Sequence, residues 1–72
     1  MSPDPRQLVG KAVRDLRKAR NWSQEELAEK AGLHRNYIGG VERGERNVAL
    51  LNIVAIAHAL KVTPSQLIDR VR

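Results

Sequence analysis

The sequence has no cysteine and no phenylalanine, and its 72 residues include one tryptophan and one tyrosine. Without cysteine, neither a disulfide bond nor a thiolate metal site is available to stabilise the fold. The scarcity of aromatic side chains disfavours RNA recognition, which relies on bases stacking on such side chains. No apolar run approaches the roughly 18 residues of a transmembrane helix, and no signal-peptide pattern is present. We therefore expect a cytoplasmic protein that does not contact a membrane.

Groups that could perform catalysis are equally scarce. His34 and His58 are isolated in the sequence, which leaves no cluster of metal ligands. No pair of carboxylates lies in an apolar setting that would make one an acid and the other a base. We therefore expect no enzymatic activity, no metal or cofactor and no small-molecule ligand.

Positive charge is what the sequence has in excess. Thirteen lysine and arginine residues against eight aspartate and glutamate residues give a formal net charge of +5. A small basic domain is suited to binding the phosphate backbone of a nucleic acid. The same excess also fits an ordinary solvated surface, so composition alone leaves both interpretations open.

The apolar residues recur with a helical period throughout, and no segment of four or more residues alternates convincingly as a strand. Ser23 and Glu26 have the spacing of a capping box. Asp4 and Thr63 each precede a proline and are suitable N-caps, and Asn47 is expected to cap the fourth helix. We predict one all-α domain, residues 1–72, with helices at residues 5–20, 24–31, 35–43, 48–60 and 64–71.

The second and third of these helices are short and are joined only by Gly32, Leu33 and His34. Two short helices joined by a tight turn that contains glycine form a helix-turn-helix. Neither helix could bury its apolar face alone, so the first and fourth helices must pack over them. The sequence therefore predicts a compact five-helix domain built around a helix-turn-helix.

The third helix has two different faces. Ile38 and Val41 lie on the side expected to join the core, and the other side contains Asn36, Gly39, Gly40 and Arg43. A glycine in a helix interior costs roughly 1 kcal/mol relative to alanine, so both positions call for an explanation. We expect Gly39 and Gly40 to face outward and to let the helix approach the bases of DNA closely. The alternative is that they only make the helix flexible.

Three segments, "SQEELAEKAGL", "YIGGVERGERN" and "LLNIVAIAHALKV", resemble the small helix-turn-helix repressors of the phage Cro and CI type, the XRE family. Within it the chain is most similar to the controller proteins of restriction-modification systems. The residues that match a controller-protein signature are Arg35, Tyr37, Ile38, Gly40, Glu42, Arg43, Gly44, Arg46 and Asn47. The resemblance implies a lambda-repressor-like fold in a bacterial or phage-encoded protein. It also implies a homodimer that binds a pseudo-palindromic operator and activates or represses transcription.

Within a helix-turn-helix, the first turn of the third helix meets the edges of the bases. The chemistry of Arg35 suits guanine and that of Asn36 suits adenine. Tyr37 is long enough to reach DNA, although it could instead pack at the edge of the core. The expected base-contact residues are Arg35, Asn36, Tyr37, Gly39 and Gly40.

Contacts with the DNA backbone are expected from helix N-termini and from cations around the third helix. The candidates are Ser23, Gln24, His34, Arg43, Arg46 and Asn47. Ser23 and His34 also occupy cap positions, and the two arginines could simply be solvated. Glu42 falls near the core edge of the third helix, which is an unusual place for a carboxylate beside DNA. The resemblance pairs Glu42 with Arg17 in a structural salt bridge.

The fourth helix has more apolar surface than one core face requires. One stripe, expected in the core, consists of Leu50, Ile53, Ile56, Ala57 and Leu60. A second strip, with residues from the last helix, is the predicted dimer interface and consists of Leu51, Val54, Ala55, Ile68 and Val71. The alternative is that the last helix covers part of this strip within one chain.

These observations predict a sequence-specific regulator of transcription that binds double-stranded DNA as a homodimer, most like a restriction-modification controller protein. A phage or plasmid repressor, or the antitoxin of a toxin–antitoxin pair, would have the same fold. Neighbouring genes distinguish these alternatives: a methyltransferase and endonuclease pair in the first case and a small toxin in the last.

Overall fold

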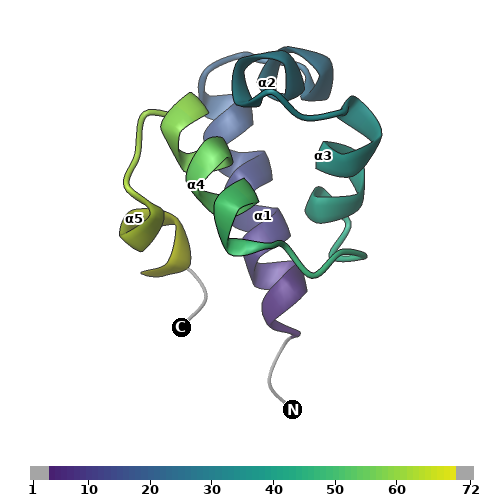
Figure 1. Cartoon of the computed structure of the whole chain (residues 1–72), viewed down its shortest axis with the longest axis vertical. Helices are drawn as coiled ribbons and strands as arrows, with labels where there is room; N and C mark the ends of the chain where they lie inside the picture. Colours follow the sequence, from purple (N-terminus) through teal and green to yellow (C-terminus); the bar gives the residue numbers. More distant parts are fainter. Residues whose placement is uncertain (1–3, 70–72) are drawn as a thin grey trace.

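A computed structural model describes residues 4–69, and in this range helices joined by short connections are the only regular secondary structure (Figure 1). The five helices confirm the predicted all-α fold. Helix α4 crosses in front of α1, and α5 and α3 lie on opposite sides of α4 in this view. The helices are α1 (Pro5–Ala19), α2 (Gln24–Ala31), α3 (Arg35–Glu42), α4 (Leu50–Ala59) and α5 (Pro64–Asp69).

The first helices begin at the predicted caps. The Asp4 side chain accepts a hydrogen bond from the backbone N–H of Arg6 at the start of α1. The hydrogen bonds from the Arg6 side chain lower the pKa of the Asp4 carboxyl from its ordinary value. Ser23 and Glu26 form both hydrogen bonds of a capping box at the start of α2. Helix α2 ends at Gly32, whose φ of 70° is a conformation that glycine adopts without strain.

The start of the fourth helix was predicted wrongly. Helix α4 begins at Leu50 rather than at residue 48, and its N-cap is Ala49, which forms no side-chain cap hydrogen bond. Asn47 therefore does not cap this helix. The physical reason is Val48, which packs against the core from the connection that precedes the helix. Smaller differences occur at the helix ends, where Arg20, Arg43 and Leu60 are C-caps. Residues 70 and 71 of the predicted last helix lie outside the described residues.

One hydrophobic core joins all five helices. Its buried residues are aliphatic, as the composition requires, and they are Ala12, Val13, Leu27, Ala28, Ile38, Val41, Ile56, Ala57, Leu60 and Leu67. Helix α3 packs against both α1 and α2, so the core fixes the position of the helix-turn-helix. Among the described residues, no helix combines the length and the apolar character needed to cross a bilayer.

Helices α1 and α3 approach each other closely at Gly10, which is buried. A Cβ atom at this position would overlap the carbonyl oxygen of Val41 and would lie 2.8 Å from that of Glu42. Both obstacles are backbone atoms, so they could move only if the whole of α3 moved. The absence of a side chain at Gly10 therefore sets the distance between α1 and α3.

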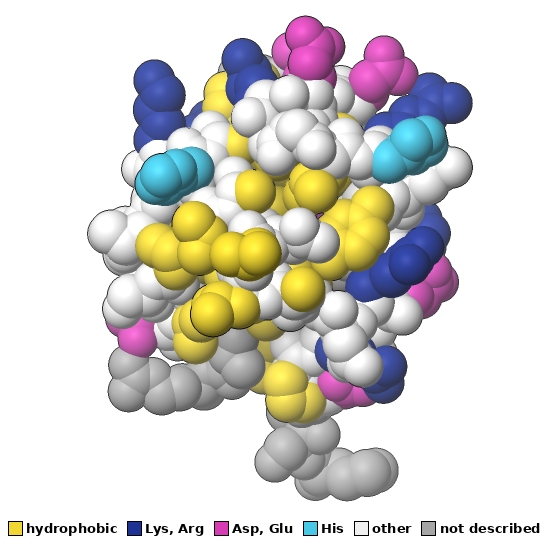
Figure 2. Space-filling view, in the orientation of Figure 1, with side chains coloured by type: hydrophobic (Ala, Val, Ile, Leu, Met, Phe, Trp, Pro, Cys, Tyr) yellow, Lys and Arg dark blue, Asp and Glu magenta, His cyan; other side chains and the backbone are white. Residues whose placement is uncertain are grey.

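An apolar patch remains exposed on α4 and α5, where hydrophobic side chains gather in Figure 2. Leu51 is 80% exposed and Ile68 is 45% exposed, whereas Val54 and Ala55 are half-buried. Leu50, expected in the core, is instead 69% exposed, because it occupies the first position of α4 beyond the reach of the core. Val71, the remaining residue of the predicted interface, lies outside the described residues. We refer to Leu50, Leu51 and Ile68 as the α4–α5 patch.

Candidate nucleic-acid interface

The N-terminal turn of α3 presents polar side chains to solvent. Ile38 and Val41 on the opposite face are buried, as predicted, while Arg35 and Asn36 are exposed. Because the buried face is fixed in the core, the exposed turn has a defined position on the surface. This arrangement can offer hydrogen-bond donors and acceptors to the edges of bases in a groove.

His34 is the N-cap of α3. Its Nδ1 accepts a hydrogen bond of 3.0 Å from the backbone N–H of Asn36. An accepting Nδ1 carries no proton, so the neutral ring carries its proton on Nε2. The exposed His34 therefore both caps the helix and retains an N–H that can donate to an acceptor outside the protein.

Arg35 already has a partner on the neighbouring helix. Its Nη1 lies 3.0 Å from a carboxylate oxygen of Glu25 in α2, and the side chains of the two residues are 64% and 70% exposed. Exposed ion pairs of this kind contribute little to stability, so the guanidinium can exchange Glu25 for another acceptor. No spacing rule relates residues 25 and 35, so this pair could not be predicted from the sequence.

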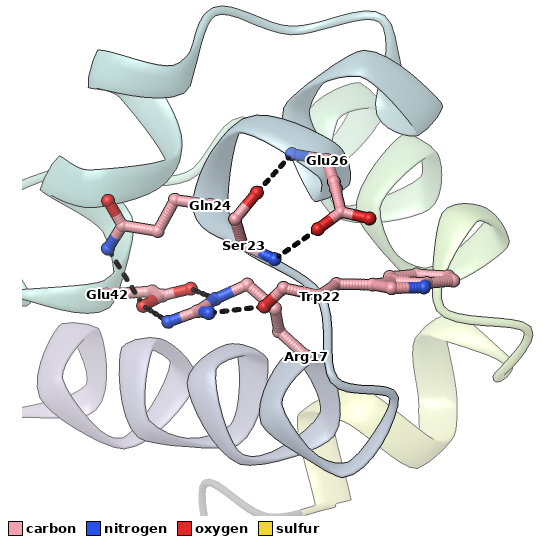
Figure 3. Close-up of polar contacts among 6 residues, drawn as sticks. All are labelled: Arg17, Trp22, Ser23, Gln24, Glu26 and Glu42. Atoms are coloured by element: carbon pink, nitrogen blue, oxygen red, sulfur yellow. Dashed lines mark hydrogen bonds and ion pairs between the residues drawn. The ribbon is translucent and has the colours of Figure 1, made fainter.

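A buried ion pair holds the far end of α3 to α1 (Figure 3). The Arg17 guanidinium donates to both carboxylate oxygens of Glu42, from Nε at 2.7 Å and from Nη2 at 2.9 Å. The side chains are only 10% and 3% exposed. The hydrogen bond to Glu42 raises the pKa of Arg17 from its ordinary value. Two parallel charge-assisted hydrogen bonds fix both the distance and the orientation of the helices.

Two further groups complete this network. Arg17 Nη1 donates to the carbonyl oxygen of Trp22 at 2.7 Å, and Gln24 Nε2 donates to Glu42 at 3.1 Å. Within the described residues, no buried side-chain nitrogen or oxygen lacks a hydrogen-bond partner. Gln24, a predicted backbone contact, thus links the start of α2 to the end of α3. Ser23 beside it is exposed, and its hydroxyl accepts the capping bond while keeping its own hydrogen.

Gly39 and Gly40 are buried. The expectation that they are exposed on the outer face of the helix is therefore wrong. Long polar side chains cover them. A Cβ atom at Gly39 would lie 3.1 Å from Nη1 of Arg43 and 3.2 Å from Oε1 of Gln24, and one at Gly40 would lie 3.1 Å from Cγ of Arg46. The sequence could not show this, because Arg46 and Gln24 belong to other parts of the chain.

Arg46 extends from Gly40 to the ring of Tyr37, with its guanidinium carbon 5.5 Å from the ring centroid. Tyr37 is half-buried and packs against the core, which agrees with the second of the two expected environments. Arg43 forms an exposed ion pair with Glu45 at 3.1 Å. Asn47 is exposed on the connection to α4.

The arrangement presents charged and hydrogen-bonding groups around α3. Among residues 4–69, no group of three histidine, cysteine, aspartate or glutamate residues is placed to hold a metal ion. Arg14 and Lys18, which were not among the predicted site residues, are two exposed cations of α1 that line a cleft with Gln24 and Arg43. Their spacing was a usable signal, because residues 14, 17 and 18 share one face of a helix.

The chain is similar to known helix-turn-helix proteins. A family model described as helix-turn-helix matches residues 13–67. The control protein C.SmaI from Serratia marcescens is 46% identical over 67 residues, which are 93% of this chain and 80% of that protein. The control protein C.BamHI from Bacillus amyloliquefaciens is 49% identical over 70 residues, covering 96% of this chain and 86% of that protein.

The fold is also similar to that of a solved controller-protein structure. The crystal structure of the restriction-modification controller protein C.AhdI from Aeromonas hydrophila matches with a TM-score of 0.84 at 50% identity. The match covers 86% of this chain and 94% of that one. The chain therefore belongs to the helix-turn-helix family, in the branch that includes the restriction-modification controller proteins.

Proposed function

We propose that this protein is a transcription regulator that binds a specific DNA operator as a homodimer, in the role of a restriction-modification controller protein. The observation that carries the proposal is the exposed first turn of α3 on a helix whose other face is buried. Relatives that share almost the whole chain are control proteins. The proposed activity requires no catalytic residue, metal or cofactor, and it takes place in the cytoplasm, where the DNA is.

In this proposal the N-terminal turn of α3 reads bases in the major groove. Arg35 exchanges Glu25 for the O6 and N7 acceptors of a guanine, and Asn36 pairs with the N6 and N7 groups of an adenine. Tyr37 approaches the DNA at the flank of the helix. Gly39 and Gly40 form part of this surface, and the absence of their side chains lets the Arg43 and Arg46 side chains lie against α3.

The DNA backbone is held from both ends of the same surface. At one end, Ser23 and Gln24 begin α2, where backbone N–H groups favour a phosphate. His34 adds its Nε2–H at the start of α3. The contacts expected at the other end of α3 come from Arg43, Arg46 and Asn47. Such contacts fix the register of the protein on the duplex without reading sequence.

The α4–α5 patch supports a dimer with two-fold symmetry. Exposed leucine and isoleucine side chains gathered on one face are typical of an interaction site, and a second copy of the chain would bury them. Figure 1 places α5 and α3 on opposite sides of α4, so a dimer joined through α4 and α5 would leave both reading helices accessible. Val54, Ala55 and Val71 complete the interface as proposed from the sequence.

The proposal is tested by selecting bound duplexes from a random pool. We expect two half-sites related by dyad symmetry, with centres about one helical turn apart. The Arg35→Ala variant should tolerate any base at one position of each half-site, because a bidentate contact contributes about 1–3 kcal/mol of discrimination. Selected sequences without dyad symmetry, or a monomer in sedimentation with operator present, would contradict the dimer.

The Gly40→Ala variant distinguishes two reasons for the glycine. A new Cβ would displace Arg46, whose Nε would lie only 3.2 Å away. If Gly40 accommodates Arg46, the substitution should weaken operator binding in the wild-type background but have little further effect in an Arg46→Ala background. If Gly40 instead allows DNA to approach, the loss should be equal in both backgrounds. Fluorescence anisotropy with labelled operator measures all four affinities of this double-mutant cycle.

A further inference from the structure

Helices α1, α2 and α3 meet at an open cleft of about 250 Å³ beside the far end of the reading helix. It is lined by Arg14, Arg17, Lys18, Gln24, Glu42 and Arg43. Four of these residues are cations and one is an anion, so the lining carries a formal charge of +3. The first helix contributes three of the four cations, although no DNA contact was expected from it.

The only carboxylate of the lining does not neutralise the exposed cations. Both Glu42 oxygens already accept hydrogen bonds from Arg17, and one of them also accepts from Gln24. Arg14 and Lys18 are exposed, and neither forms a side-chain hydrogen bond or ion pair within the part of the chain that the structure describes. Arg43 pairs with Glu45 at 3.1 Å, so Arg14 and Lys18 are the described cations of the lining without a counter-charge, and they create a positive potential in the cleft. A bound anion would neutralise this potential.

The cleft continues into the middle of α3. Gly39 lies beside Gln24 and Arg43, both of which also line the cleft, so there is no separation between the cleft and the reading face. The first turn of α2 opens onto the same place through Gln24. An anion in the cleft would therefore lie immediately next to the DNA that α3 is proposed to read.

We infer that the cleft binds a phosphate of the DNA backbone, with Arg14 and Lys18 as contact residues that act together with Gln24 and Arg43. The inference rests on the proposed function and extends its DNA contacts to the first helix. A phosphate contact strengthens binding to every sequence and makes it more sensitive to salt. Arg14 and Lys18 therefore contribute affinity without contributing to operator choice.

The test compares Arg14→Gln and Lys18→Gln with a matched variant, Lys61→Gln, which removes one exposed charge from the connection between α4 and α5. Affinity for the selected operator and for an unrelated duplex is measured over a range of salt concentrations. Each cleft variant should weaken binding to both duplexes by the same factor. Each should also lower the slope of log affinity against log salt by about 1 per bound protomer.

A slope change of this size can be measured as a change in relative affinity between low and high salt. For each bound protomer, the disadvantage of a cleft variant should shrink about fourfold between roughly 50 and 200 mM salt. The Lys61→Gln variant should keep the wild-type slope. If the cleft variants behave like Lys61→Gln, the inference is wrong while operator binding by the wild type stands. If the wild type selects no operator, the proposed function itself fails.

A second experiment distinguishes two possible ligands of the cleft, a phosphate of the DNA backbone and a free anion. Thermal unfolding is followed with inorganic phosphate and with chloride at equal ionic strength. We expect phosphate to raise the unfolding temperature of the wild type and of Arg14→Gln by the same amount. A phosphate effect that Arg14→Gln abolishes, together with an unchanged DNA salt slope, would assign the cleft to a small anion and overturn the inference.

Discussion

Glu42→Gln is expected to lower the free energy of unfolding by about 3–5 kcal/mol, because it leaves the buried Arg17 guanidinium without a counter-charge. The side chains of this pair are 10% and 3% exposed, so contact with water compensates for little of the lost carboxylate. A domain of this length has a total stability of roughly 4–11 kcal/mol. A loss of this size is a large fraction of the total, and at the lower end of that range it leaves the variant largely unfolded. Urea titration followed by circular dichroism measures the change.

The chain contains a matched control for this substitution. Glu25→Gln removes the carboxylate of another Arg–Glu pair, Arg35 with Glu25, whose side chains are more than half exposed. Exposed pairs contribute about 0–1 kcal/mol, so this variant should unfold close to the wild-type midpoint. Equal losses in the two variants would contradict the view that Glu42 and Arg17 hold α3 to α1.

Gly10→Ala is expected to destabilise the protein, although the same change normally stabilises a helix by roughly 1 kcal/mol. The added Cβ would overlap the backbone carbonyls of Val41 and Glu42, and overpacking of this kind costs about 1–3 kcal/mol. The overlap can be relieved only by moving α3 away from α1. Operator affinity should therefore fall together with the unfolding temperature.

Gly39→Ala serves as the control, because it makes the same chemical change in a helix of the same core. Its Cβ would approach only the ends of the Arg43 and Gln24 side chains, at 3.1 and 3.2 Å. These ends can shift by a few tenths of an ångström, so the unfolding temperature should stay close to that of the wild type. A Gly10→Ala variant as stable as Gly39→Ala would show that the helices can adjust their spacing freely.

The sequence predicted the local features of the fold well, because capping is decided by neighbouring residues. Ser23 and Glu26 fixed the start of α2, and the period of the apolar residues correctly assigned Ile38 and Val41 to the core. The same reasoning failed at Asn47. Its side chain suits an N-cap, but the burial of Val48 moved the start of α4 two residues along the chain.

The candidate site was less predictable, since its geometry depends on contacts between distant segments. Periodicity placed Glu42 near the core edge, but its pairing with Arg17 was expected only from the family resemblance. A helical wheel placed Gly39 and Gly40 on the outer face and could not show that arginines from the following turn and loop would cover them. Gly10 was overlooked for the same reason, because its role depends on how α1 crosses α3.

Arg46 lies across Gly40 and against the ring of Tyr37 before any DNA is bound. A free arginine side chain samples many rotamers, and immobilising a flexible side chain at an interface costs about 0.5–1.5 kcal/mol in conformational entropy. Part of that loss has already occurred during folding in this protein. If Arg46 contacts the DNA as proposed, the glycine and the tyrosine pre-organise this long cation at the edge of α3, and the entropic cost of association is lower.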